Sequence, residues 1–215
     1  MTLDQTMGNW GDFREAASPA RLSIDSVRDR VRGYSYRPIA ADDGAALSAA
    51  VLVPLYHLGN ELHVILTKRT MLVTMQQGHI SFPGGGREPG DQDLLATALR
   101  EGFEEIGLDP RRVEIFGRID DFWTRNGQIL VAGFVGLIDP LASPYPWRPA
   151  ETEVAEILEV PVRHFLDPLN LTVAEPRQVN GRLSPNETFL FREHRVFGAT
   201  ARALRNLLNI AFAEV

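Results

Sequence analysis

Three glutamates, Glu101, Glu104 and Glu105, follow one another at spacings of three and one residues. On a helix this spacing places the three carboxylates on one face, where each pair of like charges costs a few tenths of a kcal/mol. Hard cations such as Mg²⁺ and Mn²⁺ prefer oxygen ligands, so the cluster is a candidate metal site. A solvated acidic face is the simpler explanation for a bare Glu-x-x-Glu-Glu, and the surrounding sequence must decide between the two.

The surrounding residues predict a glycine loop followed by one amphipathic helix. Three consecutive glycines, Gly84, Gly85 and Gly86, precede a segment with apolar residues at helical spacing, namely Leu95, Leu99, Phe103 and Ile106. We expect this apolar stripe to face the core and the glutamates to lie opposite. Gly107 is typical of a helix C-cap, and Asp109-Pro110 prevents the helix from continuing.

Loop, helix, carboxylates and stop together resemble the Nudix box, Gly-x5-Glu-x7-Arg-Glu-U-x-Glu-Glu-x-Gly-U, where U is a bulky aliphatic residue. The second half matches from Arg100 onward. In the first half, Gln92 stands at the first acidic position, and Asp91 is reached from Gly85 only if one residue is inserted. Gly102 replaces a bulky aliphatic residue, which predicts close packing of the helix on a sheet.

The resemblance implies a metal-dependent hydrolase of nucleoside diphosphate derivatives. It makes Glu101, Glu104 and Glu105 ligands of Mg²⁺ or Mn²⁺ and catalytic residues. The backbone N–H groups of Gly84–Gly86 would contact phosphate, because no Cβ stands between them and the substrate. A non-catalytic nucleotide-binding module built on the same scaffold is the alternative, and it typically lacks some of these carboxylates.

The residues before the glycines point to a substrate. Ile65-Leu66-Thr67-Lys68-Arg69-Thr70, Gly78 and Phe82-Pro83-Gly84-Gly85 resemble the signature of coenzyme A pyrophosphatases, and Val196–Ala201 is similar to the start of their closing helix. Thr74 departs from the signature where it carries a second arginine, and Val131-Ala132-Gly133 departs from the usual Val-Thr-Pro. The expected substrate is therefore coenzyme A or acyl-CoA, with ADP-ribose and dinucleoside polyphosphates as alternatives.

Four further residues have two interpretations each. Arg69 is the best candidate for a side-chain contact to phosphate, and a surface salt bridge is the other explanation. By resemblance, Glu153 after a proline-rich loop is a candidate general base or additional catalytic ligand, and otherwise a plain exposed residue. Phe122 and Trp123 either stack on an adenine or belong to the core.

Composition limits the function classes. The chain has 215 residues, 44% of them hydrophobic, a formal net charge of −6 and no cysteine. An acidic chain argues against nucleic acid or an anionic membrane as the main partner, so we expect a small-molecule nucleotide, with homodimer formation left open. The absence of cysteine excludes disulfides and thiolate chemistry and fits a cytoplasmic protein.

The order of expected elements predicts an α/β fold, and with the resemblance a Nudix-type α/β/α sandwich with a mixed β-sheet. We expect a polar N-terminal arm at residues 1–21 and one domain at 22–215. The predicted helices besides the one after the glycines span residues 23–32, 162–166 and 198–213. The predicted strands span residues 45–56, 61–69, 79–82, 112–119, 128–138, 154–160, 169–174 and 188–191. The first two are separated by a short segment with Gly59-Asn60, which predicts a β-hairpin or adjacent strands of the sheet.

Overall fold

The computed structural model describes residues 22–39, 48–73, 76–124, 129–139, 144–179 and 182–213. The predicted arm at residues 1–21 and the departure at Thr74 lie outside these ranges. The helices are α1 (Ile24–Gly33), α2 (Leu94–Ile106), α3 (Val162–Leu166) and α4 (Gly198–Phe212), with short 3₁₀ turns at Pro110–Arg112 and Pro168–Asn170. The strands are β1 (Ala49–Leu58), β2 (Glu61–Arg69), β3 (Ile80–Ser81), β4 (Gly84–Gly86), β5 (Val113–Thr124), β6 (Ile129–Ile138), β7 (Val154–Pro161), β8 (Leu171–Val179), β9 (Arg182–Phe191) and β10 (His194–Phe197).

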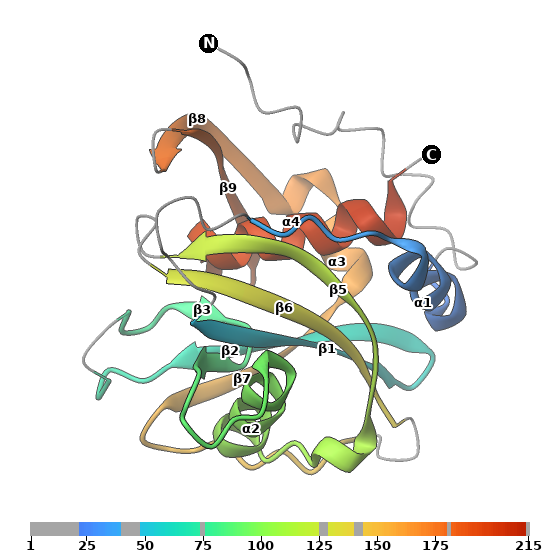
Figure 1. Ribbon diagram of the computed structural model, residues 1–215. Helices are drawn as coiled ribbons and strands as arrows, with labels where there is room; N and C mark the ends of the chain where they lie inside the picture. Colours follow the sequence, from blue (N-terminus) through green and yellow to red (C-terminus); the bar gives the residue numbers. More distant parts are fainter. Residues whose placement is uncertain are drawn as a thin grey trace.

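A mixed sheet forms the middle of the molecule (Figure 1). Within the ranges given above, seven strands belong to it, with β3-β2-β1-β6-β5 as the main order, β4 paired with β1, and β7 paired with β2. β1 and β6 run parallel, whereas the other neighbours are antiparallel. The predicted hairpin between β1 and β2 is confirmed, and Gly59 in its turn has a φ of +62°.

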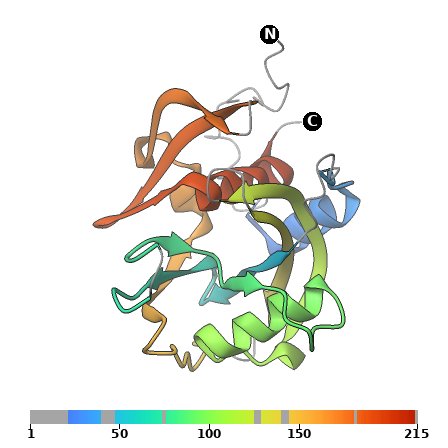
Figure 2. The ribbon, with the colours of Figure 1, turned by 60° about the vertical axis from the view of Figure 1, so that its left-hand side comes forward.

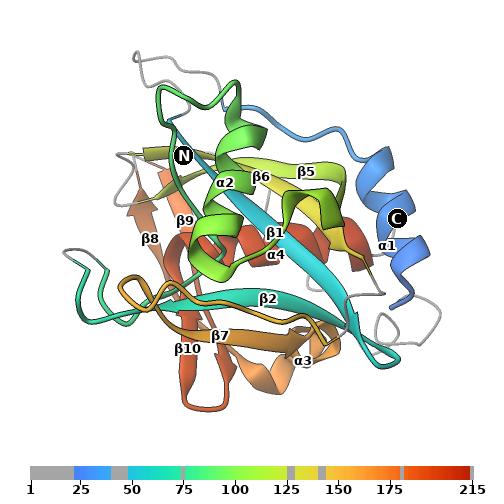
Figure 3. The same cartoon turned by 90° about the horizontal axis from the view of Figure 1, so that it is seen from below.

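Helices cover both faces of this sheet, so the predicted α/β/α arrangement is confirmed. Along β1, Val53 and Leu55 belong to the core under α1 and α4, whereas Leu52 and Tyr56 belong to the core under α2. Figure 3, seen from below, has α2 in front of β1 and α4 behind it. Buried residues on both sides of one strand explain why its sequence is almost continuously apolar.

The ends of α2 follow from capping residues. The side chain of Asp93 accepts a hydrogen bond from the Ala96 N–H at 2.8 Å, which begins the helix. Gly107 ends the helix in the left-handed region, with a φ of +70° and its N–H bonded to the Phe103 carbonyl at 2.9 Å. The predicted C-cap is therefore confirmed, and the chain turns there without strain.

The predicted orientation of α2 is wrong in part. Phe103 is 58% exposed, although it belongs to the apolar stripe, and the buried face instead includes Ala98, Gly102 and Glu105 beside Ile106. A Cβ on Gly102 would lie 3.3 Å from Leu52 Cδ2, so the helix backbone packs very close to β1. Small residues fit this close approach and a phenylalanine does not, as the Gly102 prediction anticipated.

A second sheet, absent from the sequence-based prediction, covers part of α4 (Figure 2). It has the order β10-β9-β8, with both pairs antiparallel. The strands expected at 169–174 and 188–191 are longer than predicted, and β10 was missed. The turn before β10 places Arg192 at a φ of +54°, a conformation that glycine or asparagine would normally have signalled.

Two substitutions on α2 test which of its faces is buried. Ile106 is fully buried, so Ile106→Ala should lower the free energy of unfolding by about 2–5 kcal/mol. Phe103→Ala removes an exposed ring and should change it by no more than about 0.5 kcal/mol. Urea denaturation of both variants measures the difference, and a larger loss for Phe103→Ala would contradict the observed orientation.

Candidate active site

The three glycines form a strand without side chains between β1 and α2. Gly84, Gly85 and Gly86 of β4 pair with residues 49–51 of β1. A Cβ on Gly84 would lie 2.4 Å from the Ala50 carbonyl oxygen, and a Cβ on Gly85 would lie 2.4 Å from Oε1 of Glu101. At Gly84 a Cβ would overlap with the backbone of β1, so only glycine fits there, and at Gly85 the bare backbone lies directly against the carboxylate of Glu101.

Glu105 is the most unusual of these carboxylates. Its side chain is 3% exposed, and no hydrogen-bond partner for its buried Oε2 is found in the described part of the chain. Burial, and then the negative charge of Glu101, raise its pKa to about 8, while Arg69 and the Gly84 N–H act in the opposite direction. The carboxylate of Glu105 is thus buried without enough positive charge or hydrogen-bond donors around it to stabilise its ionised form.

Arg100 organises the remaining acidic side chains. Its guanidinium contacts Glu101 at 2.9 Å, Glu104 at 2.8 Å and the Gly86 carbonyl oxygen at 2.9 Å. Asp91 holds the other edge of Arg100 with both carboxylate oxygens, at 3.0 and 3.1 Å. Arg100, the Glu88 N–H and the Thr97 hydroxyl keep the pKa of Asp91 well below its usual range.

The loop that carries Glu153 is attached to the end of α2. Ala150 N–H donates to the Glu105 carbonyl at 2.9 Å, Arg148 N–H donates to the Ile106 carbonyl at 3.0 Å, and the Glu153 carbonyl accepts from Thr70 N–H at 2.8 Å. The negative charge of Glu153 contributes to the raised pKa of both Glu101 and Glu105. The structure therefore brings Glu153 to the same site, from a segment some fifty residues further along.

Glu104 is placed differently from the other two glutamates. Its side chain is 54% exposed and pairs with Arg100 at the rim. Across the residues that the structure describes, no three carboxylate or imidazole groups converge closely enough to share one ion as they stand. Arg100 holds one oxygen of Glu101 and one of Glu104, which leaves the second oxygen of each carboxylate outside this ion pair.

The donor set nevertheless fits a hard divalent cation. The oxygens of Glu101 and Glu105 are the ligand type that Mg²⁺ and Mn²⁺ prefer, and Oε2 of Glu105 is buried without a partner. A cation there would satisfy this oxygen and return the pKa of Glu105 toward its ordinary value.

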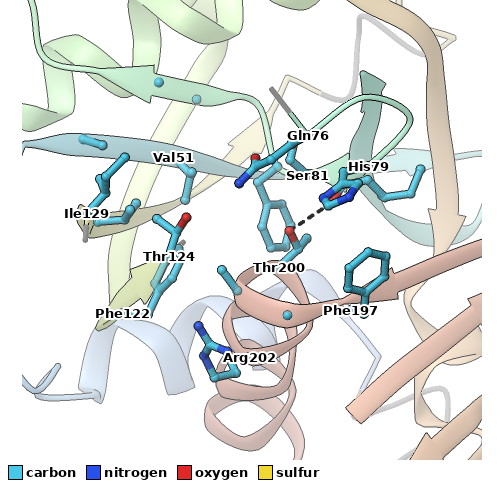
Figure 4. A pocket seen from close by; sticks show the side chains of 18 of the residues that line it. Val51, Gln76, His79, Ser81, Phe122, Thr124, Ile129, Phe197, Thr200 and Arg202 are labelled. Atoms are coloured by element: carbon cyan, nitrogen blue, oxygen red, sulfur yellow. Dashed lines mark hydrogen bonds between the residues drawn. The ribbon is translucent and has the colours of Figure 1, made fainter. Parts of the chain in front are cut away.

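A pocket of about 540 Å³ opens beside the glycines (Figure 4). Arg69 and Gly84–Gly86 line it next to the carboxylates, and Phe122 lines it from β5. Trp123 is not among its lining residues, so of the two aromatic candidates only Phe122 can meet a ligand there. His79 also lines the pocket, edge-on to Phe197 with ring centroids 5.0 Å apart.

The opposite wall comes from α4 and was missed by sequence reasoning. Thr200 and Arg202 line the pocket, although the sequence-based prediction placed no site residue on this helix. The polar positions between the apolar ones, next to the recognised helix start at Val196–Ala201, were the available signal. Thr200 Oγ1 donates to the Ile80 carbonyl at 3.0 Å and ties α4 to β3.

A family model described as NUDIX domain matches residues 46–182. The chain is 39% identical over 149 residues to the peroxisomal coenzyme A diphosphatase NUDT7 of Mus musculus, covering 67% of this chain and 59% of the mouse protein. It thus spans less than two thirds of that relative. It is 33% identical over 191 residues to the uncharacterized Nudix hydrolase NudL of Salmonella heidelberg, covering 87% of this chain and 94% of that protein.

Solved structures give weaker similarities. A C. elegans Ap4A hydrolase is 17% identical with a TM-score of 0.45, covering 55% of this chain and 82% of that one. The NUDIX domain of Shewanella oneidensis NrtR, complexed with ADP ribose, is 18% identical with a TM-score of 0.45, covering 63% of this chain and 82% of that one.

The raised pKa of Glu105 predicts how stability depends on pH. In the metal-free protein Glu105 keeps its proton up to about pH 8, whereas in the unfolded chain it ionises near 4.5. The unfolded state therefore binds fewer protons between these values, and this residue lowers stability as pH rises from about 5 to 8. Glu105→Gln should be more stable than wild type at pH 8, on the order of 1–3 kcal/mol, and similar at pH 5.

Urea denaturation in EDTA at both pH values measures this difference. Glu104→Gln is the matched control, because its exposed carboxylate should show no such dependence. Equal stabilities of wild type and Glu105→Gln at pH 8 would contradict the assignment of Glu105 as an uncompensated buried acid.

Proposed function

The chain belongs to the Nudix hydrolase family, because the NUDIX domain model matches more than half of it. From that premise we propose that it hydrolyses the diphosphate bond of a nucleoside diphosphate derivative with Mg²⁺ or Mn²⁺ as cofactor. The proposed substrate is coenzyme A or acyl-CoA, which would give adenosine 3′,5′-bisphosphate and 4′-phosphopantetheine or its acylated form.

The observation that carries this proposal is the buried, unsatisfied carboxylate of Glu105 beside a glycine strand and an open pocket. A protein that only needed a stable fold would gain by replacing this acid with an apolar residue. Its position next to Glu101 supports a role in binding a cation. Arg69 Nη1 lies 3.8 Å from Glu105 Oε1, which supports the proposal that this guanidinium binds phosphate beside the carboxylates.

The residues divide the work as follows. Glu101, Glu104 and Glu105 would hold the ion or ions, which supply Lewis-acid activation of water and neutralise the diphosphate. Arg69 and the backbone of Gly84–Gly86 would orient the diphosphate for attack on one phosphorus, with the second phosphate as leaving group. Glu153, carried by the loop fixed to α2, is the proposed general base that takes the proton from the attacking water.

Coenzyme A is favoured over other nucleotides by two observations. The mouse relative with 39% identity is named a coenzyme A diphosphatase. The residues that resemble the coenzyme A signature surround the pocket, since Arg69, Phe82 and Gly84 all line it. A pocket of about 540 Å³ lies within the usual range for small-molecule sites.

The proposal also includes one domain at 22–215 and a cytoplasmic location. Both α1 and α4 pack into the core of the central sheet, which supports a single unit. In the part of the chain covered by the structure, no helix combines the length and the apolar character needed to cross a bilayer.

A substrate panel tests the reaction. With Mg²⁺ or Mn²⁺, coenzyme A should be converted to adenosine 3′,5′-bisphosphate and 4′-phosphopantetheine, as measured by separation of the products on ion exchange. Turnover of ADP-ribose or a dinucleoside polyphosphate without turnover of coenzyme A would refute coenzyme A as the substrate. It would leave the proposed hydrolase activity standing. Tight nucleotide binding without turnover of any substrate would instead indicate the non-catalytic module.

Two matched variants rank the carboxylates by their contribution to kcat. Glu105→Gln should lower kcat by about two to four orders of magnitude, because it removes the most buried ligand. Glu104→Gln should have a smaller effect, since its side chain is half exposed. Near-normal turnover by a folded Glu105→Gln protein would remove the role assigned to Glu105.

A further inference from the structure

Arg202 lies on α4 in the wall of the pocket, whereas the three glutamates of the proposed reaction centre lie on α2. Figure 4 shows its side chain rising from α4 toward Phe122. Nη2 donates to the Trp123 carbonyl oxygen, which fixes the guanidinium at the end of β5. The remaining donors of this planar group are then available in a defined orientation.

The charge of Arg202 has no acidic partner among the residues that the structure describes. Burial lowers its pKa, and no carboxylate opposes that effect. Arg205, one turn further along the same helix, is also largely buried but is paired with Glu187 at 2.9 Å. A buried cation without an acidic partner loses hydration free energy that nothing in the protein replaces. Arg202 is therefore suited to pair with an anionic group of a bound ligand.

The surroundings of Arg202 indicate which part of a ligand this anion belongs to. Phe122, Thr124 and Ile129 line the same region of the pocket, and they offer an aromatic ring and β-branched side chains to a flat base. The diphosphate would lie at Arg69 and Gly84–Gly86, so Arg202 meets a separate substituent of the nucleoside. A phosphate monoester matches a guanidinium in charge and in bidentate geometry.

We propose that Arg202 binds a phosphate monoester on the ribose of the substrate and selects 3′-phosphorylated nucleotides over those without this group. The inference rests on the proposed function and deepens it. It adds a specificity-determining residue on α4 that lies outside the Nudix box.

Coenzyme A and 3′-dephospho-coenzyme A differ only in this phosphate, so the two substrates test the proposal. Wild type should prefer coenzyme A in kcat/KM by about tenfold or more, as expected for hydrogen bonds to a charged group. Arg202→Gln should raise KM for coenzyme A by a similar factor. Its kcat for coenzyme A and its kcat/KM for 3′-dephospho-coenzyme A should stay within about twofold of the wild-type values. Arg202→Lys should restore part of the preference.

Arg195→Gln is the matched control, because Arg195 is exposed on β10 and does not line the pocket. It removes the same charge from the protein and should leave the preference unchanged. Preference lost equally in this variant would assign the effect to long-range charge and overturn the specific role of Arg202.

The possible results separate the inference from the proposed function. Equal turnover of both substrates by wild type, or equal losses on both in Arg202→Gln, would refute the role of Arg202 and leave the hydrolase intact. If Arg202→Gln lost more kcat/KM on succinyl-CoA than on acetyl-CoA, Arg202 would bind the acyl end of the substrate. That result would also refute its proposed role at the 3′-phosphate.

If wild type hydrolyses neither substrate, the proposed function fails and binding decides the inference. Calorimetry without metal should then show tighter binding of adenosine 3′,5′-bisphosphate than of adenosine 5′-monophosphate. Arg202→Gln should remove that difference, and an unchanged difference would refute the proposal.

Discussion

The site depends on a stretch of backbone that leaves no room for side chains. β4 lies between β1 and α2, where a Cβ on Gly84 or Gly85 would overlap with Ala50 or Glu101. Because these glycines are bare, α2 approaches the sheet closely enough to bury Glu105 beside the Gly84 N–H. Burial of the acid, its raised pKa and the open pocket next to it all follow from this close packing.

Charge is distributed unevenly over the acidic cluster. Arg100 is shared by Asp91, Glu101 and Glu104 at 2.8 to 3.0 Å, whereas Glu105 lies 3.8 Å from Arg69 and has the Gly84 N–H as a hydrogen-bond donor. The same helix therefore carries two acids that share the charge of Arg100 and a more deeply buried acid, Glu105, whose charge is less well compensated. Such an arrangement is typical of functional sites, where local stability is given up for chemistry.

The sequence predicted α2, its C-cap at Gly107 and the pairing of β1 with β2, because capping and turn residues act over a few positions. It assigned the wrong exposure to Phe103, because hydrophobic periodicity cannot anticipate a helix that buries a glutamate and a glycine against the sheet. It also missed β10 and the position of Arg202 in the wall of the pocket. The pocket joins residues from β1 and α4 that lie about 150 positions apart, and no local pattern reports such a contact.

The contacts of Arg100 bear on whether the protein must bind its proposed metal ion before it can fold. A metalloprotein whose ligands repel each other often needs its ion in order to fold. Here an arginine on the same helix offsets part of the charge of two of the carboxylates in the fold without a metal. Under the proposed metal dependence, we expect loading of the ion to be a separate, reversible step after folding, in which a chelator stops turnover and leaves the fold intact.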